Sequence, residues 1–195
     1  MNVLLMTEIL NKLSKSKYIF IGEQHGKKAI TEKVFSIIKE LEGKIIFCVE
    51  LPQEVEDLLQ KLLQKKITEK ELFASPYLED ALHDHRLHSG TLELYQKLYN
   101  KGVPIHCLES YEGSIEERDK NMAKRFLETI QNEKADYYII YAGNVHVMRK
   151  ESDLFGFHIT PIPIYLPKEI VKEVITLQCT EKEGIVQCEL EKDVL

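Results

Sequence analysis

Two histidines of this 195-residue sequence, a residue type suited to acid–base or metal chemistry, stand in the same local pattern, each two residues after a polar side chain. Glu23 and His25 follow the apolar run YIFIG, and Asn144 and His146 follow the run YIIYAG. In both places a glycine precedes the histidine by three residues, so the pattern G-x-x-H occurs twice. Because glycine permits a sharp backbone turn, each histidine is predicted to point across the end of a strand.

Two further carboxylates occupy equivalent places. Glu50 ends the apolar run KIIFCVE, and Glu109 ends the run VPIHCLE. Ligands of open α/β sheets bind outside the carboxyl ends of the strands. If the four runs are parallel strands, these polar residues converge on one edge of the sheet. Taken singly, any of the carboxylates could instead cap the helix that follows it.

The rest of the chain alternates apolar runs with amphipathic segments, which is typical of parallel strands covered by helices. The apolar runs predict strands at 17–22, 44–50, 103–109 and 136–143. Apolar residues at helical spacing predict helices within 1–17, 30–41, 55–63, 92–99 and 114–130, with boundaries marked by Pro52, Gly102 and a capping-box pattern of Ser114 with Glu117. The predicted fold class is therefore α/β: a mainly parallel central sheet flanked by helices on both faces, in a single domain spanning residues 1–195.

Two segments depart from this alternation. Residues 67–90 are predicted to form a lid-like helical insertion near the strand ends. The run TPIPIYLP is too rich in proline for a central strand. Residues 168–195 predict a terminal antiparallel β-hairpin turning at Glu183 and Gly184, which either caps a sheet edge or joins two chains in a homodimer.

Composition narrows the class of partner. The balance of 26 Lys and Arg against 32 Asp and Glu gives a net charge of -6, which argues against a nucleic-acid partner. No stretch approaches the roughly 20 apolar residues of a membrane span, and the amino terminus is typical of a first helix, so we expect a cytoplasmic protein. Cys48 and Cys107 lie in apolar runs and are predicted to be buried thiols. Cys179 and Cys188 could face each other in the hairpin, but free thiols are favoured in a reducing compartment.

The motif HDHRLH places His83, His85, Arg86 and His88 in the middle segment. It is either a solvated polar stretch before the next helix or part of a lid that offers His85 or Arg86 to a substrate. Haem ligation by these histidines is a less favoured alternative. Tyr77 and Tyr111 are candidate substrate-side hydroxyls, whereas structural roles are expected for His106 and His158, which lie inside a strand and near the proline-rich run.

The strand-end residues fit two kinds of chemistry. Two histidines and one or two carboxylates suffice to hold a divalent metal ion with one position open for water. The same residues without a metal could form a histidine base oriented by a carboxylate. The residue types leave both alternatives open.

Four segments in order, IGEQHG, CVELP, SIEERDKNMAKR and YAGNVHV, resemble the superfamily that joins erythromycin-esterase-like proteins, ChaN-like haem-binding proteins and the TraB/Tiki proteases. The resemblance covers residues 18 to 166. It implies an α/β fold with its site at the strand ends, and for Tiki-like members metal-dependent hydrolysis of peptide bonds. In the esterase-like branch it implies that His25 is the general base without a metal, and in the ChaN-like branch it implies haem binding.

The resemblance also implies roles for single residues. His25 and His146 would be bases or metal ligands, with Glu23 and Glu50 as their acidic partners. Arg118 would bind an anion or stabilise the transition state. We therefore expect a hydrolase of peptide or ester bonds, acting on a peptide or a small molecule. The catalytic residues would be His25, Glu23, His146 and Arg118, the metal ligands His25, His146, Glu50 and Glu23, and the substrate-binding residues Asn144, Glu109, His85 and Arg86. The alternative function is a non-enzymatic haem- or metal-binding protein.

Overall fold

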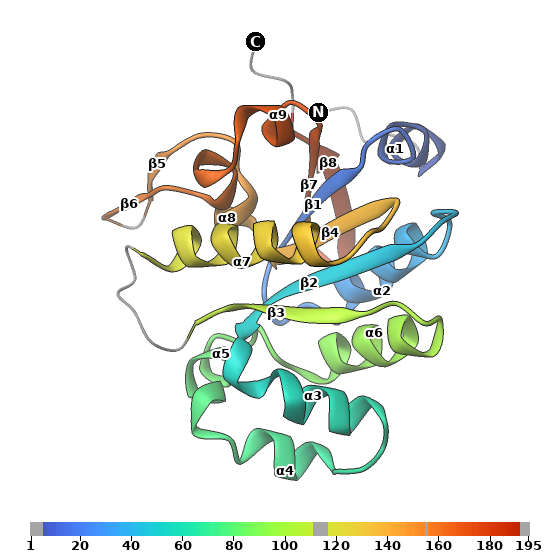
Figure 1. The fold of residues 1–195 in the computed structure, drawn as a ribbon, viewed down its shortest axis with the longest axis vertical. Coiled ribbons are helices and arrows are strands. Elements are labelled where there is room, and N and C mark those ends of the chain that lie inside the picture. The colour runs from blue at the N-terminus through green and yellow to red at the C-terminus, as the bar shows by residue number, and fades with distance from the viewer. Residues whose placement is uncertain (1–5, 111–116, 155, 192–195) are drawn as a thin grey trace.

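A computed structural model describes residues 6–110, 117–154 and 156–191. Its centre is a six-stranded sheet in the order β3-β2-β4-β1-β7-β8 (Figure 1). The strands are β1 (Tyr18–Glu23), β2 (Ile45–Pro52), β3 (Ile105–Glu109), β4 (Tyr137–Gly143), β7 (Val174–Lys182) and β8 (Ile185–Leu190). All neighbouring strands pair in parallel except β7 and β8, which form an antiparallel hairpin. The predicted mainly parallel sheet with a C-terminal hairpin is confirmed.

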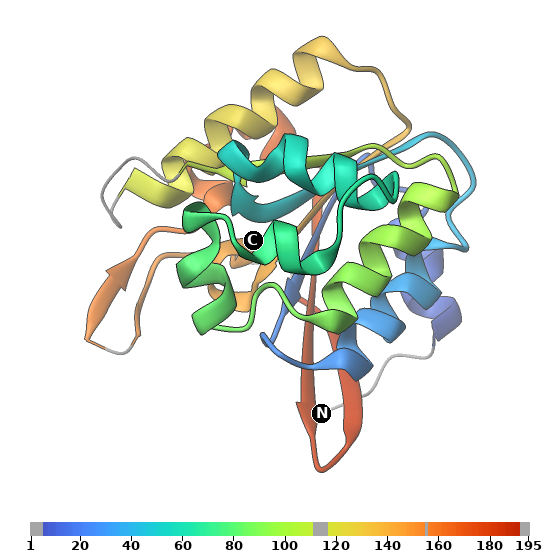
Figure 2. The same ribbon diagram turned by 90° about the horizontal axis from the view of Figure 1, so that it is seen from below.

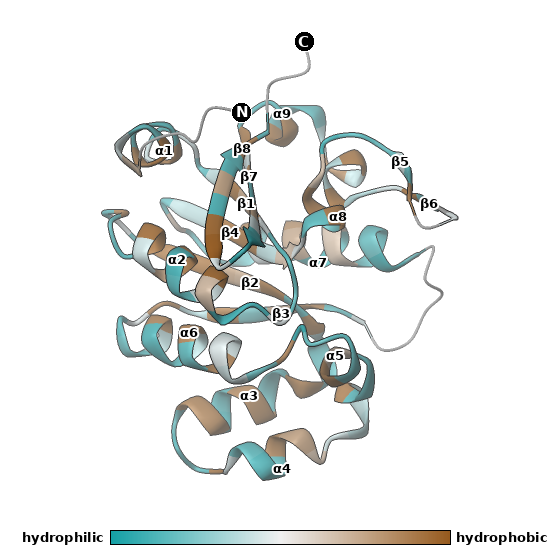
Figure 3. Ribbon diagram, turned by 180° about the vertical axis from the view of Figure 1, so that it is seen from behind, coloured by the Kyte–Doolittle hydropathy of each residue, from teal (hydrophilic) through white to brown (hydrophobic). Residues whose placement is uncertain are grey.

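Helices cover both faces of the sheet, as predicted (Figures 1 and 3). One face packs against α1 (Met6–Leu13), α2 (Lys28–Ile38), α3 (Glu56–Leu63) and α6 (Ser89–Asn100), whose buried side chains include Leu13, Val34, Leu59 and Leu94. The other face packs against α7 (Arg118–Asn132), α8 (Asn144–Val147) and the 3₁₀ turn η4 (Ile162–Tyr165), with Phe126, Val147 and Ile162 in its core. Every residue of β1 and β2 is buried, because helices lie on both sides of these strands.

The segment 67–90 is helical, as expected. It contains α4 (Glu69–Phe73), the 3₁₀ turn η2 (Pro76–Leu78) and α5 (Glu79–His83), preceded by the 3₁₀ turn η1 (Gln53–Val55) and α3 (Figure 2). A Thr68 capping box with Glu71 begins α4, and Leu72 and Leu78 anchor the segment in the larger core. The segment therefore packs against the α3 and α6 side of the sheet, and the loop after α5 reaches the strand ends.

Several boundaries differ from the prediction. Pro52 is both the last residue of β2 and the N-cap of η1, which leads directly into α3, so a 3₁₀ turn separates it from the predicted α-helix. Ser114 and Tyr111 lie outside the described residues, so the predicted capping box and the Tyr111 hydroxyl stay predictions. A short hairpin of β5 (Ser152–Leu154) and β6 (Phe157–Ile159) was not predicted, and the proline-rich run forms η4 and not a strand.

The terminal hairpin extends the main sheet, because β7 pairs in parallel with β1. A short helix, α9 (Lys168–Val171), leads into β7. Cys179 and Cys188 face each other across the hairpin and form a disulfide, so the expectation of free thiols is wrong. The predicted hairpin does place the two cysteines opposite each other, and the inference from a reducing compartment is the one that failed. Within the described ranges, none of the helices is long and apolar enough to cross a membrane.

Candidate active site

The strand ends meet as the sequence predicts. Glu23 is the last residue of β1 and stands in register with Gly143, the last residue of β4. Glu50 lies near the end of β2, the strand that lies between β3 and β4 in the sheet. Glu109 is the last residue of β3. The parallel topology thus places carboxylates from three strands beside the turn that carries His146.

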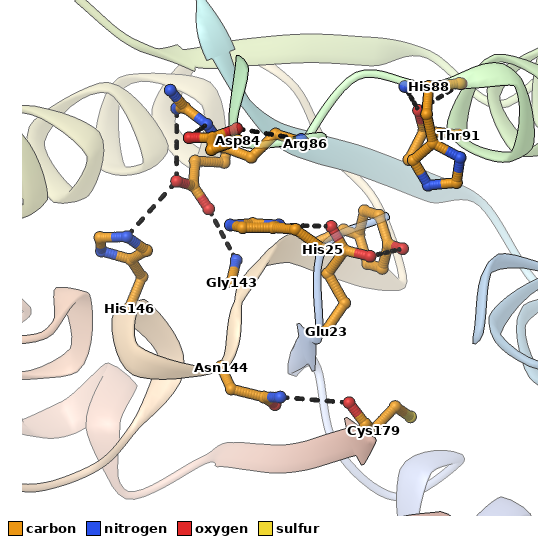
Figure 4. Close-up of polar contacts among 12 residues, drawn as sticks. Glu23, His25, Asp84, Arg86, His88, Thr91, Gly143, Asn144, His146 and Cys179 are labelled. Carbon is orange, nitrogen blue, oxygen red and sulfur yellow. Dashed lines mark hydrogen bonds and ion pairs between the residues drawn. The ribbon is translucent and has the colours of Figure 1, made fainter. Parts of the chain in front are cut away.

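His25 and Glu23 form an oriented pair (Figure 4). His25 Nδ1 lies 2.8 Å from Glu23 Oε1, and the Tyr141 hydroxyl donates to Glu23 Oε2 at 2.8 Å. Glu23 is 4% exposed, whereas the His25 side chain is 27% exposed. Burial lowers the pKa of His25, but the hydrogen bond to Glu23 and the charge of Glu50 outweigh it, so the pKa is raised. The imidazole is therefore held from its buried side and is reachable from solvent.

Glu50 is the centre of the cluster. Its Oε2 accepts a hydrogen bond from the Gly143 backbone N–H at 2.6 Å, and its Oε1 accepts from the Arg118 guanidinium. Arg86 Nη1 and His146 Nε2 each lie 3.4 Å from the same Oε1. Burial raises the pKa of Glu50, but the charges of His146, Arg118 and Arg86 outweigh burial. The pKa of Glu50 is therefore lowered from the ordinary 4.5 to about 2. Glu50 is consequently a fixed, ionised acceptor.

The two arginines share a second carboxylate. Arg86 Nη1 lies 2.5 Å from Glu109 Oε2, and Arg118 Nε lies 2.7 Å from Glu109 Oε1. Arg86 also contacts Asp84 through Nε at 2.7 Å. Burial raises the pKa of Glu109, and the nearby arginines only partly offset this. Arg86 is 5% exposed, whereas the Arg118 side chain is 22% exposed, so Arg118 is the guanidinium of this pair that a substrate reaches more readily.

His146 has its own acidic partner. Its Nδ1 lies 2.7 Å from Asp119 Oδ1, in the first turn of α7. Burial lowers the pKa of His146, but Glu50 and Asp119 outweigh it and raise the pKa. His25 follows the end of β1 and His146 follows the end of β4. Each histidine is thus bound through Nδ1 to a buried carboxylate, Glu23 and Asp119 respectively.

Gly143 is the contact point of the two turns. A Cβ at this position would lie 2.9 Å from His25 Nε2 and 3.5 Å from Glu50 Oε2. The absence of a side chain therefore lets the His25 ring lie against the end of β4.

The structure separates some predicted residues from the cluster. Asn144 points away from it, and its Nδ2 donates to the Cys179 carbonyl at 3.1 Å (Figure 4). His85 is exposed in a turn with φ +64°, and its carbonyl accepts from the Gly26 N–H. His88 caps α6, because its Nδ1 accepts from the Gly90 N–H at 3.1 Å. Of the HDHRLH residues, only Asp84 and Arg86 contact the strand-end cluster.

No role was predicted from the sequence for Asp84, Asp119 or Tyr141. Asp119 directly follows Arg118 in the ERD segment, so its proximity to the site had a signal in the sequence. Tyr141 precedes Gly143 by two residues in β4, and its burial gave no hint of its bond to Glu23. His106 and His158 have ion-pair partners elsewhere, Glu56 and Asp153 among them, in agreement with the structural roles expected for them.

The predicted metal ligands contact protein groups in this structure, and metal binding at this cluster stays a prediction. Glu23 and Glu50 already accept hydrogen bonds at both oxygens, from Tyr141, His25, Gly143 and guanidinium groups. Two arginines within contact of Glu50 oppose a nearby dication by charge repulsion. Among the residues that the structure describes, no three His, Cys, Asp or Glu side chains are placed to hold a metal ion. Haem ligation by the exposed His83 or His85 stays a prediction.

No protein-family model matches the chain, and no curated protein matches it in sequence. Solved structures do share its fold. One is a crystal structure of bacterial protein toxins, with 18% sequence identity and a TM-score of 0.63. The alignment covers 98% of this chain and 39% of the toxin chain. The C-terminal region of Pasteurella multocida toxin, described as having a thiol-protease-like catalytic triad, is 10% identical with a TM-score of 0.61, covering 95% of this chain and 26% of that one. The type III effector HopBA1 is 14% identical with a TM-score of 0.53, covering 94% and 90%.

These likenesses show a shared fold. The chain spans less than two fifths of the toxin chains that it resembles and nearly the whole length of the effector. The class defined by fold and site is therefore an α/β domain with a histidine–carboxylate cluster at the ends of its parallel strands.

Proposed function

We propose that the chain is a metal-independent hydrolase of the erythromycin-esterase-like branch, with His25 as general base. The observation that carries the proposal is the 2.8 Å contact between His25 Nδ1 and Glu23 Oε1, with Tyr141 holding the other oxygen of Glu23. A carboxylate that accepts the Nδ1 proton fixes the tautomer of a neutral imidazole, so that Nε2 carries the free electron pair. This arrangement is the one that a general base requires.

The reaction is a water-mediated cleavage of an ester or peptide bond. His25 Nε2 takes a proton from water as the oxygen of that water forms a bond to the carbonyl carbon of the substrate. The negative charge that develops on the carbonyl oxygen is stabilised by Arg118, whose side chain is partly exposed next to Glu50. Collapse of the tetrahedral intermediate breaks the bond to the leaving group, which receives the proton from His25.

The cysteines support water over a thiol as the nucleophile. Cys48 and Cys107 are fully buried, and burial raises the pKa of both thiols. Cys179 and Cys188 are joined in the disulfide. Since thiolate is the reactive form of cysteine, a mechanism like the thiol-protease triad described for Pasteurella multocida toxin lacks a nucleophile in this chain.

The test is a hydrolysis screen with p-nitrophenyl esters and fluorogenic peptides, with and without EDTA. We expect activity that EDTA leaves unchanged and that His25→Ala lowers by roughly 10²- to 10⁴-fold, the usual contribution of a general base. His158→Gln is the matched control, because this exposed histidine is also paired with a carboxylate, that of Asp153, but lies outside the cluster. Activity that EDTA abolishes and zinc restores would overturn the metal-independent mechanism. No hydrolysis, together with haem binding in an absorbance titration, would instead favour the non-enzymatic alternative.

A further inference from the structure

The disulfide hairpin lies directly beside the strand that carries the proposed base. β7 pairs with β1 up to Gly22, which stands opposite Gln178, and Cys179 is the next residue of β7. The Cys179–Cys188 bond then joins β7 to β8. The disulfide therefore lies one residue beyond the last β7 residue that pairs with β1, at the level where β1 leads into Glu23 and His25.

Asn144 connects this hairpin to the His146 turn. Its Nδ2 donates to the carbonyl of Cys179 at 3.1 Å. Its Oδ1 packs against Gly22, since a Cβ added to Gly22 would lie 2.5 Å from that oxygen. Asn144 is the first residue of α8, immediately after Gly143 and two residues before His146. The amide of Asn144 thus ties the backbone of a disulfide-bonded cysteine to the turn that donates to Glu50.

Gln24 forms a second connection, to the His25 turn. Its Oε1 accepts a hydrogen bond from the Glu181 backbone N–H of β7 at 3.2 Å. Gln24 stands between Glu23 and His25 in the sequence. Both turns that carry a site histidine therefore bind the same strand of the hairpin, one at the carbonyl of Cys179 and the other two residues further on, at the N–H of Glu181.

We infer that Asn144 and Gln24 are positioning residues that hold the two histidine-bearing turns against the Cys179–Cys188 hairpin, and that reduction of this disulfide loosens the site. Reduction by a dithiol breaks the Sγ–Sγ bond, gives each cysteine one hydrogen, and oxidises the dithiol to its own disulfide. β7 then keeps its hydrogen bonds to β1, but the covalent link to the outermost strand is lost. The amplitude of motion at the Cys179 carbonyl increases, and Asn144 transmits it to Gly143.

The structural test measures the NMR resonance and the hydrogen-exchange rate of the Gly143 backbone amide. This amide is chosen because its N–H donates to Glu50 at 2.6 Å. Backbone NMR and hydrogen exchange are measured on the oxidised protein and after treatment with dithiothreitol, with a thiol count to verify reduction. We expect the Gly143 resonance to shift and its exchange to become at least roughly tenfold faster on reduction, as local opening becomes easier. An unchanged resonance and exchange rate in the fully reduced protein would overturn the inference.

Two variants distinguish an effect transmitted through Asn144 from a general loosening of the fold on reduction. Cys179→Ala combined with Cys188→Ala retains Cys48 and Cys107, and it should resemble the reduced protein while no longer responding to dithiothreitol. In Asn144→Ala the response of the Gly143 amide to reduction should be largely lost. A full response in Asn144→Ala would show that the proposed connection does not carry the effect.

The effect on catalysis rests on the proposed function, whereas the NMR readout does not. If hydrolysis is found, reduction should lower kcat by roughly ten- to a hundredfold with a smaller change in KM, since small displacements of catalytic groups cost about that much. A change of the Gly143 amide on reduction, without any hydrolysis, would support the inference about the positioning residues and refute the proposed hydrolase. Hydrolysis that is equally fast in both redox forms, with an unchanged Gly143 amide, would refute the positioning and leave the hydrolase intact.

Discussion

His146 Nδ1 lies 2.7 Å from Asp119 Oδ1, the same type of contact that His25 makes with Glu23. The two pairs come from separate parts of the chain, and both histidine rings lie near Gly143 and Glu50. His146 Nε2 lies 3.4 Å from Glu50 Oε1, and His25 Nε2 lies against the Gly143 backbone. The site is thus built from two histidine–carboxylate pairs around one buried glutamate, and each pair can be altered separately.

Asp119→Asn should weaken the site without removing any residue that contacts the attacking water. The hydrogen bond and the negative charge of Asp119 both raise the pKa of His146, so this pKa should fall in the variant. An amide can also donate to Nδ1 and turn the His146 ring away from Glu50, the carboxylate that holds Arg118. Displacing the group that stabilises the oxyanion should lower kcat/KM by roughly 10²-fold. The measurements are an NMR titration of His146 and steady-state kinetics. Asp153→Asn, which removes the partner of the exposed His158, is the control, and an equal loss in both variants would contradict a specific role for Asp119.

The pH dependence of hydrolysis should report the His25 and Glu23 pair. His25 must be neutral to accept a proton, and its pKa is raised above the ordinary 6.5. The rate constant kcat/KM should therefore fall as the pH drops through that raised pKa. Glu23→Gln removes the hydrogen bond and the charge that raise this pKa, so the acidic limb should move to lower pH while the plateau falls. A limb that stays in place in Glu23→Gln would assign it to another group.

Gly143→Ala tests the close approach of His25 to β4. Gly143 has φ -56° and ψ 147°, a conformation that alanine adopts easily, so no backbone strain is expected. The new Cβ would meet His25 Nε2 at 2.9 Å, which forces the ring to move. We expect a loss of roughly 10²-fold in kcat, because a displacement of about 1 Å is enough for such an effect. Circular dichroism and the thermal midpoint should change little, and wild-type activity in a folded variant would show that the contact is not functional.

Much of the fold was predictable because its signals are local. The runs KIIFCVE and DYYIIYAG are too apolar for a half-exposed strand, and the stripes in α2 and α7 repeat at helical spacing. Helix boundaries and the order of strands were less accessible. The placement of β7 beside β1 depends on contacts between residues more than 150 positions apart, such as Phe20 with Thr176, and no local pattern encodes them.

The candidate site was predictable to the level of strand ends and no further. The parallel sheet brings Glu23, Glu50 and Glu109 together wherever their side chains point. Orientation is another matter, because adjacent residues in a tight turn point to different sides. Asn144 consequently faces Cys179 whereas His146 faces Glu50, and the sequence shows both merely as polar residues after a glycine.

Glu50→Gln should lower stability, by an amount that depends on pH. The pKa of Glu50 is about 2 in the folded protein against an ordinary value of 4.5, because the effects of His146, Arg118 and Arg86 outweigh that of burial. Its ionisation therefore stabilises the fold above about pH 4.5, and this contribution is lost as the pH falls towards 2. At pH 7 we expect a loss of about 3 kcal/mol in the free energy of unfolding by urea, since the guanidiniums lose a buried partner but retain Glu109.

The difference between wild type and Glu50→Gln should shrink between pH 4.5 and pH 2, where the wild-type carboxyl gains its proton. Glu93→Gln is the matched control, because it breaks an ion pair with Lys28 in which both side chains are about half exposed. Such pairs contribute at most about 1 kcal/mol, so this variant should unfold nearly as wild type does. If Glu50→Gln were as stable as wild type at pH 7, or if its deficit persisted at pH 2, the guanidiniums and His146 would not be stabilised by the Glu50 charge. The cluster would then have to be held by packing alone.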